Sequence, residues 1–165
     1  IKNAETPQHY EKLLEEFPRG GIFPILYNHP EYLPKVEEIA AEYRERGLVE
    51  PSNILWIYYT ISGNEEKANE YWNYLKPSER LMFRPILTRA LTEHNDQLIV
   101  NLLKRCQDAG VATPALGLIY STLMDILLMQ GKENECEKVL EDSLKICSIE
   151  NLQHKVLLKI KKHLN

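Results

Sequence analysis

Apolar residues between positions 116 and 147 recur with the period of an amphipathic helix, and the pattern is interrupted once, at Gly131. Before the glycine they stand at i, i+3, i+4, i+7, i+8 and i+11, on one helix face: Leu116, Ile119, Tyr120, Leu123, Met124 and Leu127. After it the same spacing recurs, with charged residues between, in Cys136, Val139, Leu140, Ser143, Leu144 and Cys147. Because Gly131 can adopt the left-handed conformation that ends a helix, the pattern predicts a helical hairpin with two buried faces.

The pattern of the second helix recurs upstream. Quartets with the same spacing begin at Val36, Ala68 and Ile99 and precede the one at Cys136, so their first positions are 32, 31 and 37 residues apart. Candidate turns follow the same step, at 28–30, 62–64, 94–95 and 131. A unit of about 30 to 40 residues made of helix, turn and helix is typical of α-solenoids. The sequence therefore predicts an all-α fold, a right-handed solenoid of about four helical hairpins.

The remaining helices are predicted from periodicity and from their caps. Thr6 and Pro7 open a flanking helix that Pro18 stops. Upstream of the last hairpin, helices are expected over Glu31–Arg46, Asn53–Ile61, Glu65–Leu75, Ser78–Glu93 and Asp96–Ala109. A final amphipathic helix over Asn151–Leu164 is expected to cover the last hairpin. The chain is thus divided into an N-terminal flanking helix and joint at 1–19, hairpins at 20–151 and a capping helix at 152–165.

The sequence YSTLMDILLMQGKENECEKVLEDSL at 120–144 resembles the pentatricopeptide repeat, and GLVEP at 47–51 and GVATP at 110–114 resemble its closing Gly-x-x-Pro loop. The resemblance covers roughly residues 20–151. Large apolar residues and uneven unit lengths make the chain similar to the leucine-rich pentatricopeptide proteins of animal mitochondria. The resemblance implies a mitochondrial location. It also implies that the segment binds single-stranded RNA, mitochondrial mRNA in particular, on the concave face of the first helices and supports its stability or expression.

In that family one base is recognised by each repeat through two or three side chains. Carried onto this chain, the motif pairs Ser121 with Asn151, and Asn53 with Ser78. By the same analogy a Ser and Asn pair would favour adenine. The alternative is that Ser121 and Asn53 are small polar residues facing a neighbouring helix, and that Ser78 and Asn151 are helix caps.

Arginines follow one side of the expected 78–93 helix. Arg80, Arg84 and Thr88 stand at i, i+4 and i+8, where the family places its concave face, so they could contact phosphates or stack on bases. The motif also pairs Arg84 with Pro114, and a proline side chain cannot hydrogen-bond a base. The alternative for these arginines is an ordinary solvated face.

The formal net charge of −4 counts against general nucleic-acid binding, which depends on Lys and Arg neutralising phosphates. Positive charge concentrated on one surface would remove that objection. The competing hypothesis is a protein-interaction module that docks a peptide or an RNA-binding protein through its concave surface or through its Tyr- and Trp-rich hairpin. Tyr74 falls off the apolar stripe of that hairpin and is expected to be exposed, as an interface residue would be.

Catalysis, metals and cofactors find little support. The five histidines are scattered, no Gly-rich phosphate loop appears, and neither a small-molecule substrate nor a cofactor is expected. No apolar run reaches the roughly 18 residues of a membrane span, so no membrane partner is expected. Cys106, Cys136 and Cys147 lie on apolar stripes without CxxC spacing, which favours a reducing compartment. Because Ile1 is not an initiator Met, a fragment or processed chain is expected.

Overall fold

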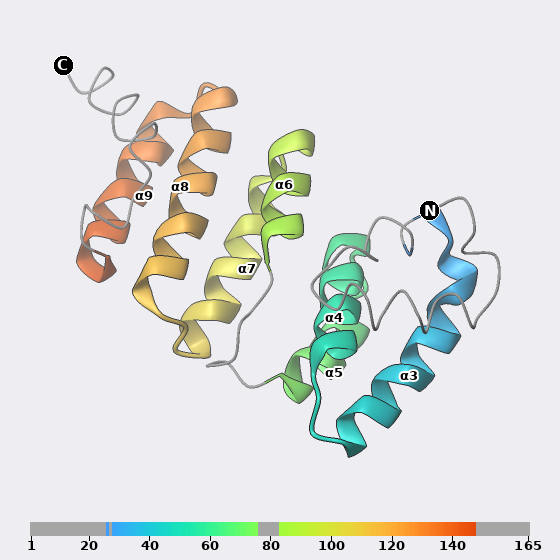
Figure 1. Ribbon diagram of the computed structural model, residues 1–165. Coiled ribbons are helices and arrows are strands. Elements are labelled where there is room, and N and C mark those ends of the chain that lie inside the picture. The colour runs from blue at the N-terminus through green and yellow to red at the C-terminus, as the bar shows by residue number, and fades with distance from the viewer. Residues whose placement is uncertain (1–25, 27, 76–82, 148–165) are drawn as a thin grey trace. The chain divides into compact units, whose positions relative to one another are not determined.

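The structure is a computed structural model, and it describes residues 26, 28–75 and 83–147 (Figure 1). Within these residues every regular element is a helix and none is a strand, so the all-α prediction is confirmed. The expected flanking helix at 1–19 and the capping helix at 152–165 lie outside the described residues.

The chain divides into two compact units, Ile1–Pro85 and Ile86–Asn165. In the N-terminal unit a short 3-10 helix, η1, precedes three α-helices, α3, α4 and α5 (Figure 1). Their bounds are Pro30–Tyr32, Leu33–Glu45, Glu50–Ser62 and Glu65–Tyr74. Helix α4 is the first helix of a hairpin and α5 is its second helix, whereas α3 carries the second-helix pattern that begins at Val36.

Helix α4 packs against both α3 and α5. The sequence predicts this position, because the helix is apolar nearly all round and therefore needs neighbours on more than one side. Four consecutive residues have no exposed surface at all: Ile54, Leu55, Trp56 and Ile57. These side chains form the centre of the N-terminal unit.

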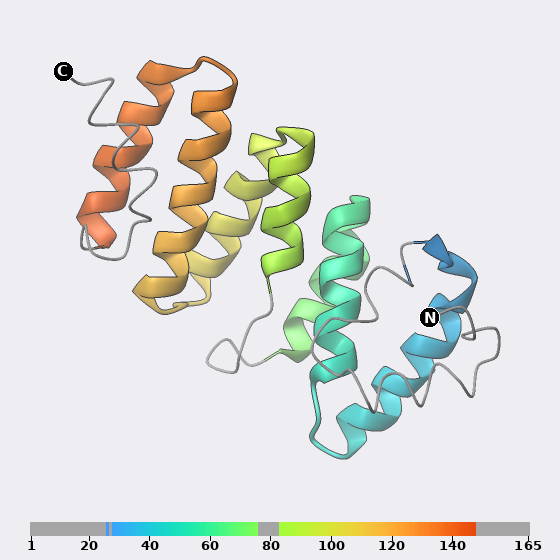
Figure 2. The same cartoon turned by 45° about the horizontal axis from the view of Figure 1, so that its top comes forward.

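The helices of the C-terminal unit are α6, α7, α8 and α9 (Figure 2). They span Arg84–Glu93, Asp96–Asp108, Thr113–Met129 and Glu133–Ile146, so α6 and α8 are first helices and α7 and α9 are second helices. Helix α8 packs against α7 and α9, and the six residues predicted for its buried face are all buried. Helix α6 begins at Arg84, later than the predicted 78–93 helix, and this start places Pro85 in the first turn, where its missing N–H is not needed.

The two second helices of this unit differ in how completely their predicted stripes are buried. In α7 all four predicted residues are buried: Ile99, Leu102, Leu103 and Cys106. In α9 and its C-cap residue, Cys136, Ser143 and Cys147 are buried and Val139 and Leu140 are half-buried, whereas Leu144 is 45% exposed. In the part of the chain that the structure describes, no helix follows α9 to cover it.

Five helices end with the same backbone motif. A residue with positive φ is followed by an N–H that donates to the carbonyl five residues before it, as from Asn64 to Tyr59 (3.0 Å) and from Lys132 to Leu127 (2.9 Å). The motif recurs at the ends of α3, α4, α6, α7 and α8, where two to four residues connect each helix to the next. The residues with positive φ are Gly47, Gly63, His94, Gly110 and Gly131.

His94 is the one residue of these five that carries a side chain, and its φ is 50°. We expect His94→Gly to raise the free energy of unfolding by about 0.5–1 kcal/mol, because the left-handed conformation strains a residue with a Cβ atom. The side chain is exposed, and the carbonyl that accepts from Gln130 Nε2 (2.7 Å) is retained by glycine. Urea denaturation measures the change. The reverse exchange at the equivalent turn, Gly131→His, should destabilise, and a less stable His94→Gly protein would contradict the account.

Candidate binding surfaces

Two of the residues predicted to contact RNA are buried. Ser121 in α8 has no exposed surface, and its hydroxyl donates to the carbonyl oxygen of Gly117 at 2.8 Å. Asn53 in the first turns of α4 is 7% exposed. Their burial is compatible with the alternative interpretation, in which both are small polar residues that face a neighbouring helix. Their expected partners Ser78 and Asn151, and the predicted contact Arg80, lie outside the described residues.

Of the predicted RNA-contacting residues in the described part of the chain, Arg84 and Thr88 have exposed side chains, and Arg84 is the one that carries charge. It begins α6, and Thr88 and Thr92 continue the same exposed line at one-turn intervals. Arg89, next to this line, lies with its Nε 2.6 Å from a carboxylate oxygen of Glu93. Helix α6 therefore presents one arginine and two hydroxyl-bearing side chains to solvent.

The other two first helices of the described hairpins contain no Lys or Arg. Helix α4 has Glu50 as its one charged residue, and α8 has Asp125 as its one charged residue. Helix α8 has one partly exposed line of side chains, which is apolar apart from Asp125. Its apolar residues are Ala115, Leu118, Leu128 and Met129, and Met129 is 46% exposed. The line of α8 could accept apolar side chains but has no cation for a phosphate.

The described residues as a whole are acidic. They contain eleven Lys and Arg against eighteen Asp and Glu, a formal charge of −7, whereas the full chain has −4. Phosphate attraction would thus have to come from isolated arginines such as Arg84 rather than from the general field of the described helices.

A cation stacked on aromatic rings lies near the ends of α3 and α5 in the N-terminal unit. The guanidinium carbon of Arg44 lies 3.9 Å from the ring centroid of Tyr74 and 5.9 Å from that of Tyr71. Its Nη1 also donates to the hydroxyl of Ser52 at 3.4 Å. Tyr74 is 41% exposed, as the sequence predicts. We call Arg44 and Tyr74 the Arg–Tyr surface; Tyr and Arg are the residue types enriched at protein interfaces.

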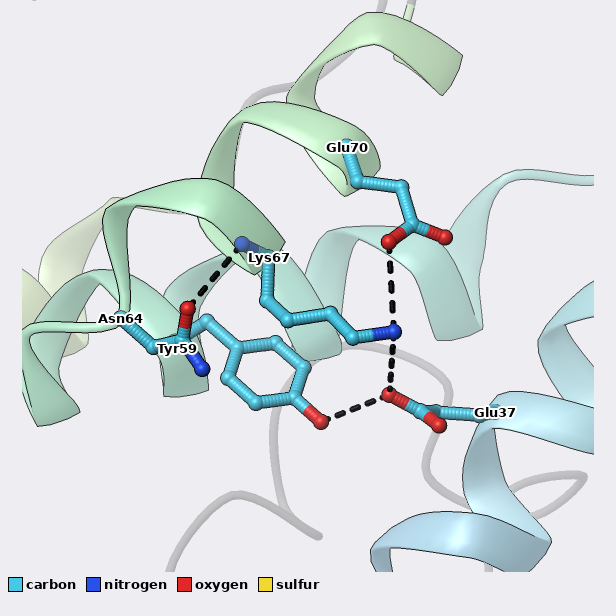
Figure 3. Close-up of polar contacts among 5 residues, drawn as sticks. All are labelled: Glu37, Tyr59, Asn64, Lys67 and Glu70. Carbon is cyan, nitrogen blue, oxygen red and sulfur yellow. Dashed lines mark hydrogen bonds and ion pairs between the residues drawn. The ribbon is translucent and has the colours of Figure 1, made fainter.

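A polar network joins the three α-helices of the N-terminal unit (Figure 3). The hydroxyl of Tyr59 on α4 donates to Glu37 Oε1 on α3 at 2.6 Å. Lys67 Nζ on α5 lies 3.5 Å from the same oxygen and 3.2 Å from Glu70 Oε2. Burial, followed by the bond to Glu37, raises the pKa of Tyr59 above its ordinary value. The bond to Glu70 is the main cause that raises the pKa of Lys67. The network links α3 to α4 and to α5, and α3 and α5 are the helices that carry Arg44 and Tyr74.

Cys106, Cys136 and Cys147 are buried in the C-terminal unit, as their stripes predict. Burial raises the pKa of both the Cys106 and the Cys136 thiols to about 11, and it also raises the pKa of the Cys147 thiol. Each thiol is therefore held in its neutral form, which is a poor nucleophile.

The Cys106 thiol makes stability depend on alkaline pH. A folded-state pKa of about 11, above the ordinary 9.0, leaves its contribution complete below pH 9 and removes it as the pH rises towards 11. We expect wild type to lose about 2 kcal/mol more than Cys106→Val between pH 8 and pH 11. Urea denaturation followed by circular dichroism measures both proteins, and tyrosine ionisation affects them equally. Equal losses would contradict the prediction.

Among the described residues no three His, Cys, Asp or Glu side chains are grouped as metal ligands, and no helix there is long and apolar enough to cross a membrane. The fold and surfaces define the class as an all-α protein built from helical hairpins. Comparisons with protein-family models, with curated proteins and with solved structures found no match.

Proposed function

We propose that the chain is a protein-docking segment of a helical-repeat protein whose hairpins stack as a right-handed α-solenoid. In each unit, a second helix packs against the first helix of the hairpin that follows it. Helix α3 packs against α4 in this way, and α7 packs against α8. The recurring helix ends give each hairpin the same turn. Two such turns also touch, because Gln130 Nε2 donates to the carbonyl oxygen of His94 at 2.7 Å. The resemblance to pentatricopeptide repeats supports the same arrangement.

The observation that carries the choice of ligand is the lack of Lys and Arg in α4 and α8. A single strand of RNA lying along first helices needs cations at regular intervals and aromatic faces for its bases. Helix α8 instead offers apolar side chains around one carboxylate, and the Arg–Tyr surface offers the residue types from which protein hot spots are made. A polypeptide partner, such as the RNA-binding protein that the sequence suggests, fits these surfaces better.

The test places a photo-crosslinking amino acid at Tyr74 of the chain expressed in cells. We expect a discrete protein adduct, identified by mass spectrometry, that is reduced when Arg44→Ala is added. The control carries the same amino acid at Lys145, whose side chain is 74% exposed in the other unit. Equal adducts at both positions, or none at Tyr74, would refute docking at the Arg–Tyr surface.

RNA binding is the second candidate, and the exposed line of Arg84 and Thr88 on a first helix favours it. Under this second candidate function, Arg80 and Arg84 contact phosphates of a mitochondrial mRNA. The pairs Ser121 with Asn151, and Asn53 with Ser78, contact bases once the buried Ser121 and Asn53 become accessible. Titration of labelled single-stranded RNAs between about 50 and 200 mM salt separates the candidates. Affinity that falls steeply with salt, with a slope reduced by Arg84→Ala, would establish RNA binding. No binding at low salt would leave the protein partner.

A further inference from the structure

Helices α7 and α9 occupy equivalent places in successive hairpins, 37 residues apart. Each begins two residues after a residue with positive φ, His94 and Gly131 respectively, and the N-caps Asn95 and Lys132 correspond. Two pairs of equivalent residues are buried to the same extent, because Ile99 and Cys136, and Cys106 and Ser143, are all at most 2% exposed.

On one face of α9, burial differs from that at the equivalent positions of α7. Leu103 is 9% exposed in α7, whereas its counterpart Leu140 in α9 is half-buried. The half-buried Gln107 has Leu144 as its counterpart, which is 45% exposed. In α7 this face meets the next first helix, since Gln107 Nε2 donates to the hydroxyl of Tyr120 in α8 at 2.7 Å. Leu140 and Leu144 are thus each more exposed than their counterparts in α7, which indicates an apolar face that lacks a cover.

The sequence of the segment that follows α9 has the pattern expected of a helix that would cover this face, as α8 covers the equivalent face of α7. Four residues separate α7 from α8, and four separate α9 from Asn151. With the same step of 37, the buried residues Ile119, Tyr120, Leu123 and Leu127 of α8 correspond to Val156, Leu157, Ile160 and Leu164. Three buried apolar residues of α8 have polar counterparts, since Leu116, Met124 and Ile126 correspond to Gln153, Lys161 and His163.

The same register changes both members of one contact together. Gln107 and Tyr120, a hydrogen-bonded pair between α7 and α8, correspond to Leu144 and Leu157, an apolar pair. Either change by itself would leave a polar group without its partner, whereas the two together restore a matched contact.

The charges on α9 and on the segment after it also favour this segment as the cover of the α9 face. Helical spacing places Glu137 three residues before Leu140, and Glu141 three residues before Leu144, so each carboxylate neighbours one of these leucines on α9. The segment after this helix is basic, with Lys155, Lys159, Lys161 and Lys162. A basic amphipathic segment would therefore find both an apolar stripe and neighbouring carboxylates on this face.

We propose that the face of α9 formed by Leu140 and Leu144, flanked by Glu137 and Glu141, is the docking surface of the chain's own segment Asn151–Leu164, with Leu157 against Leu144. The proposal is independent of the partner assigned to the Arg–Tyr surface. It makes this face of α9 an internal contact of the chain rather than a site for a second protein.

The test uses the full chain and limited trypsin digestion, with cleavage at the four lysines of the segment followed by mass spectrometry. We expect Leu144→Gln, and separately Leu157→Tyr, to accelerate this cleavage about tenfold, because each leaves a polar group against a leucine. The double variant restores the Gln–Tyr pair found between α7 and α8 and should return the rate to near that of wild type. Val100→Gln is the matched control, since Val100 in α7 is 41% exposed and should leave the rate unchanged.

Three results would overturn the proposal. Wild type cleaved as fast as Leu144→Gln would mean that the segment does not cover the face. Equal acceleration by Val100→Gln would mean that the effect is not local to α9. A double variant that is cleaved faster than both single variants would exclude the pairing of Leu144 with Leu157. Circular dichroism of each variant separates loss of docking from loss of folding.

Discussion

Trp56→Ala is expected to lower the free energy of unfolding of the N-terminal unit by about 3–5 kcal/mol. Trp56 has no exposed surface, and its ring centroid lies 4.8 Å from that of Trp72. Truncation removes the largest fully buried side chain of the described residues and leaves a cavity between α4 and α5. Urea denaturation followed by far-UV circular dichroism, together with the thermal midpoint, measures the loss.

Two further variants separate the cavity from other causes. The indole N–H of Trp56 has no acceptor among the described residues, so Trp56→Phe loses volume but no hydrogen bond and should cost less than half as much. Asn73→Ala, at an exposed position of α5, should change stability by no more than about 0.5 kcal/mol. A Trp56→Ala protein as stable as Asn73→Ala would show that α4 is not the centre of its unit.

Glu37→Ala is expected to cost about 2–3 kcal/mol. The Glu37 carboxylate accepts from the Tyr59 hydroxyl and lies near Lys67 Nζ, so it connects α3 to both helices of the next hairpin. Its removal leaves the phenol of Tyr59, a residue only 8% exposed, without this acceptor. Denaturant unfolding compared with wild type gives the change in free energy.

The neighbouring residue supplies the control. Glu38 pairs with Lys35 at 3.3 Å, but its side chain is 60% exposed, and such surface pairs contribute little. Glu38→Ala should therefore change stability by less than about 0.5 kcal/mol. Equal losses from the two alanine variants would show that the network in Figure 3 does not join the helices.

The hairpins could be predicted from the sequence because their signals are local. Apolar spacing defines the helices, and Gly63 and Gly131 mark turns through a conformation that glycine adopts without strain. Pro85 also limited where α6 could begin, and the observed start satisfies that limit. These features depend on neighbouring residues and not on how distant helices pack.

The narrow exposed side of α8 was harder to predict than its buried stripe. Ten of its residues are buried, so no wide polar face fixes which side meets solvent. The family motif would place Ser121 towards a ligand, whereas the structure buries it with its hydroxyl on the carbonyl of Gly117. A small polar residue that satisfies itself within its helix gives no pattern by which its face could be assigned.

The contacts of Arg44 and Glu37 were also missed. Each has a partner 22 or more residues away, Glu37 in Tyr59 and Arg44 in Tyr74, so they meet only after α3, α4 and α5 pack. In the sequence both residues look like ordinary charges on the polar face of an amphipathic helix. No signal short of the tertiary structure distinguishes them from Glu38 or Arg46.

The distribution of two residue types provides a separate reporter for each half of the chain. Both tryptophans, Trp56 and Trp72, lie in the N-terminal unit, and all three cysteines lie in the C-terminal unit. Trp56 and the three thiols are shielded from solvent. Unfolding of the N-terminal unit should therefore change the tryptophan fluorescence, and unfolding of the C-terminal unit should expose the thiols. Intrinsic fluorescence would follow the first half and thiol labelling the second, so the order in which the halves unfold can be observed without attaching a dye.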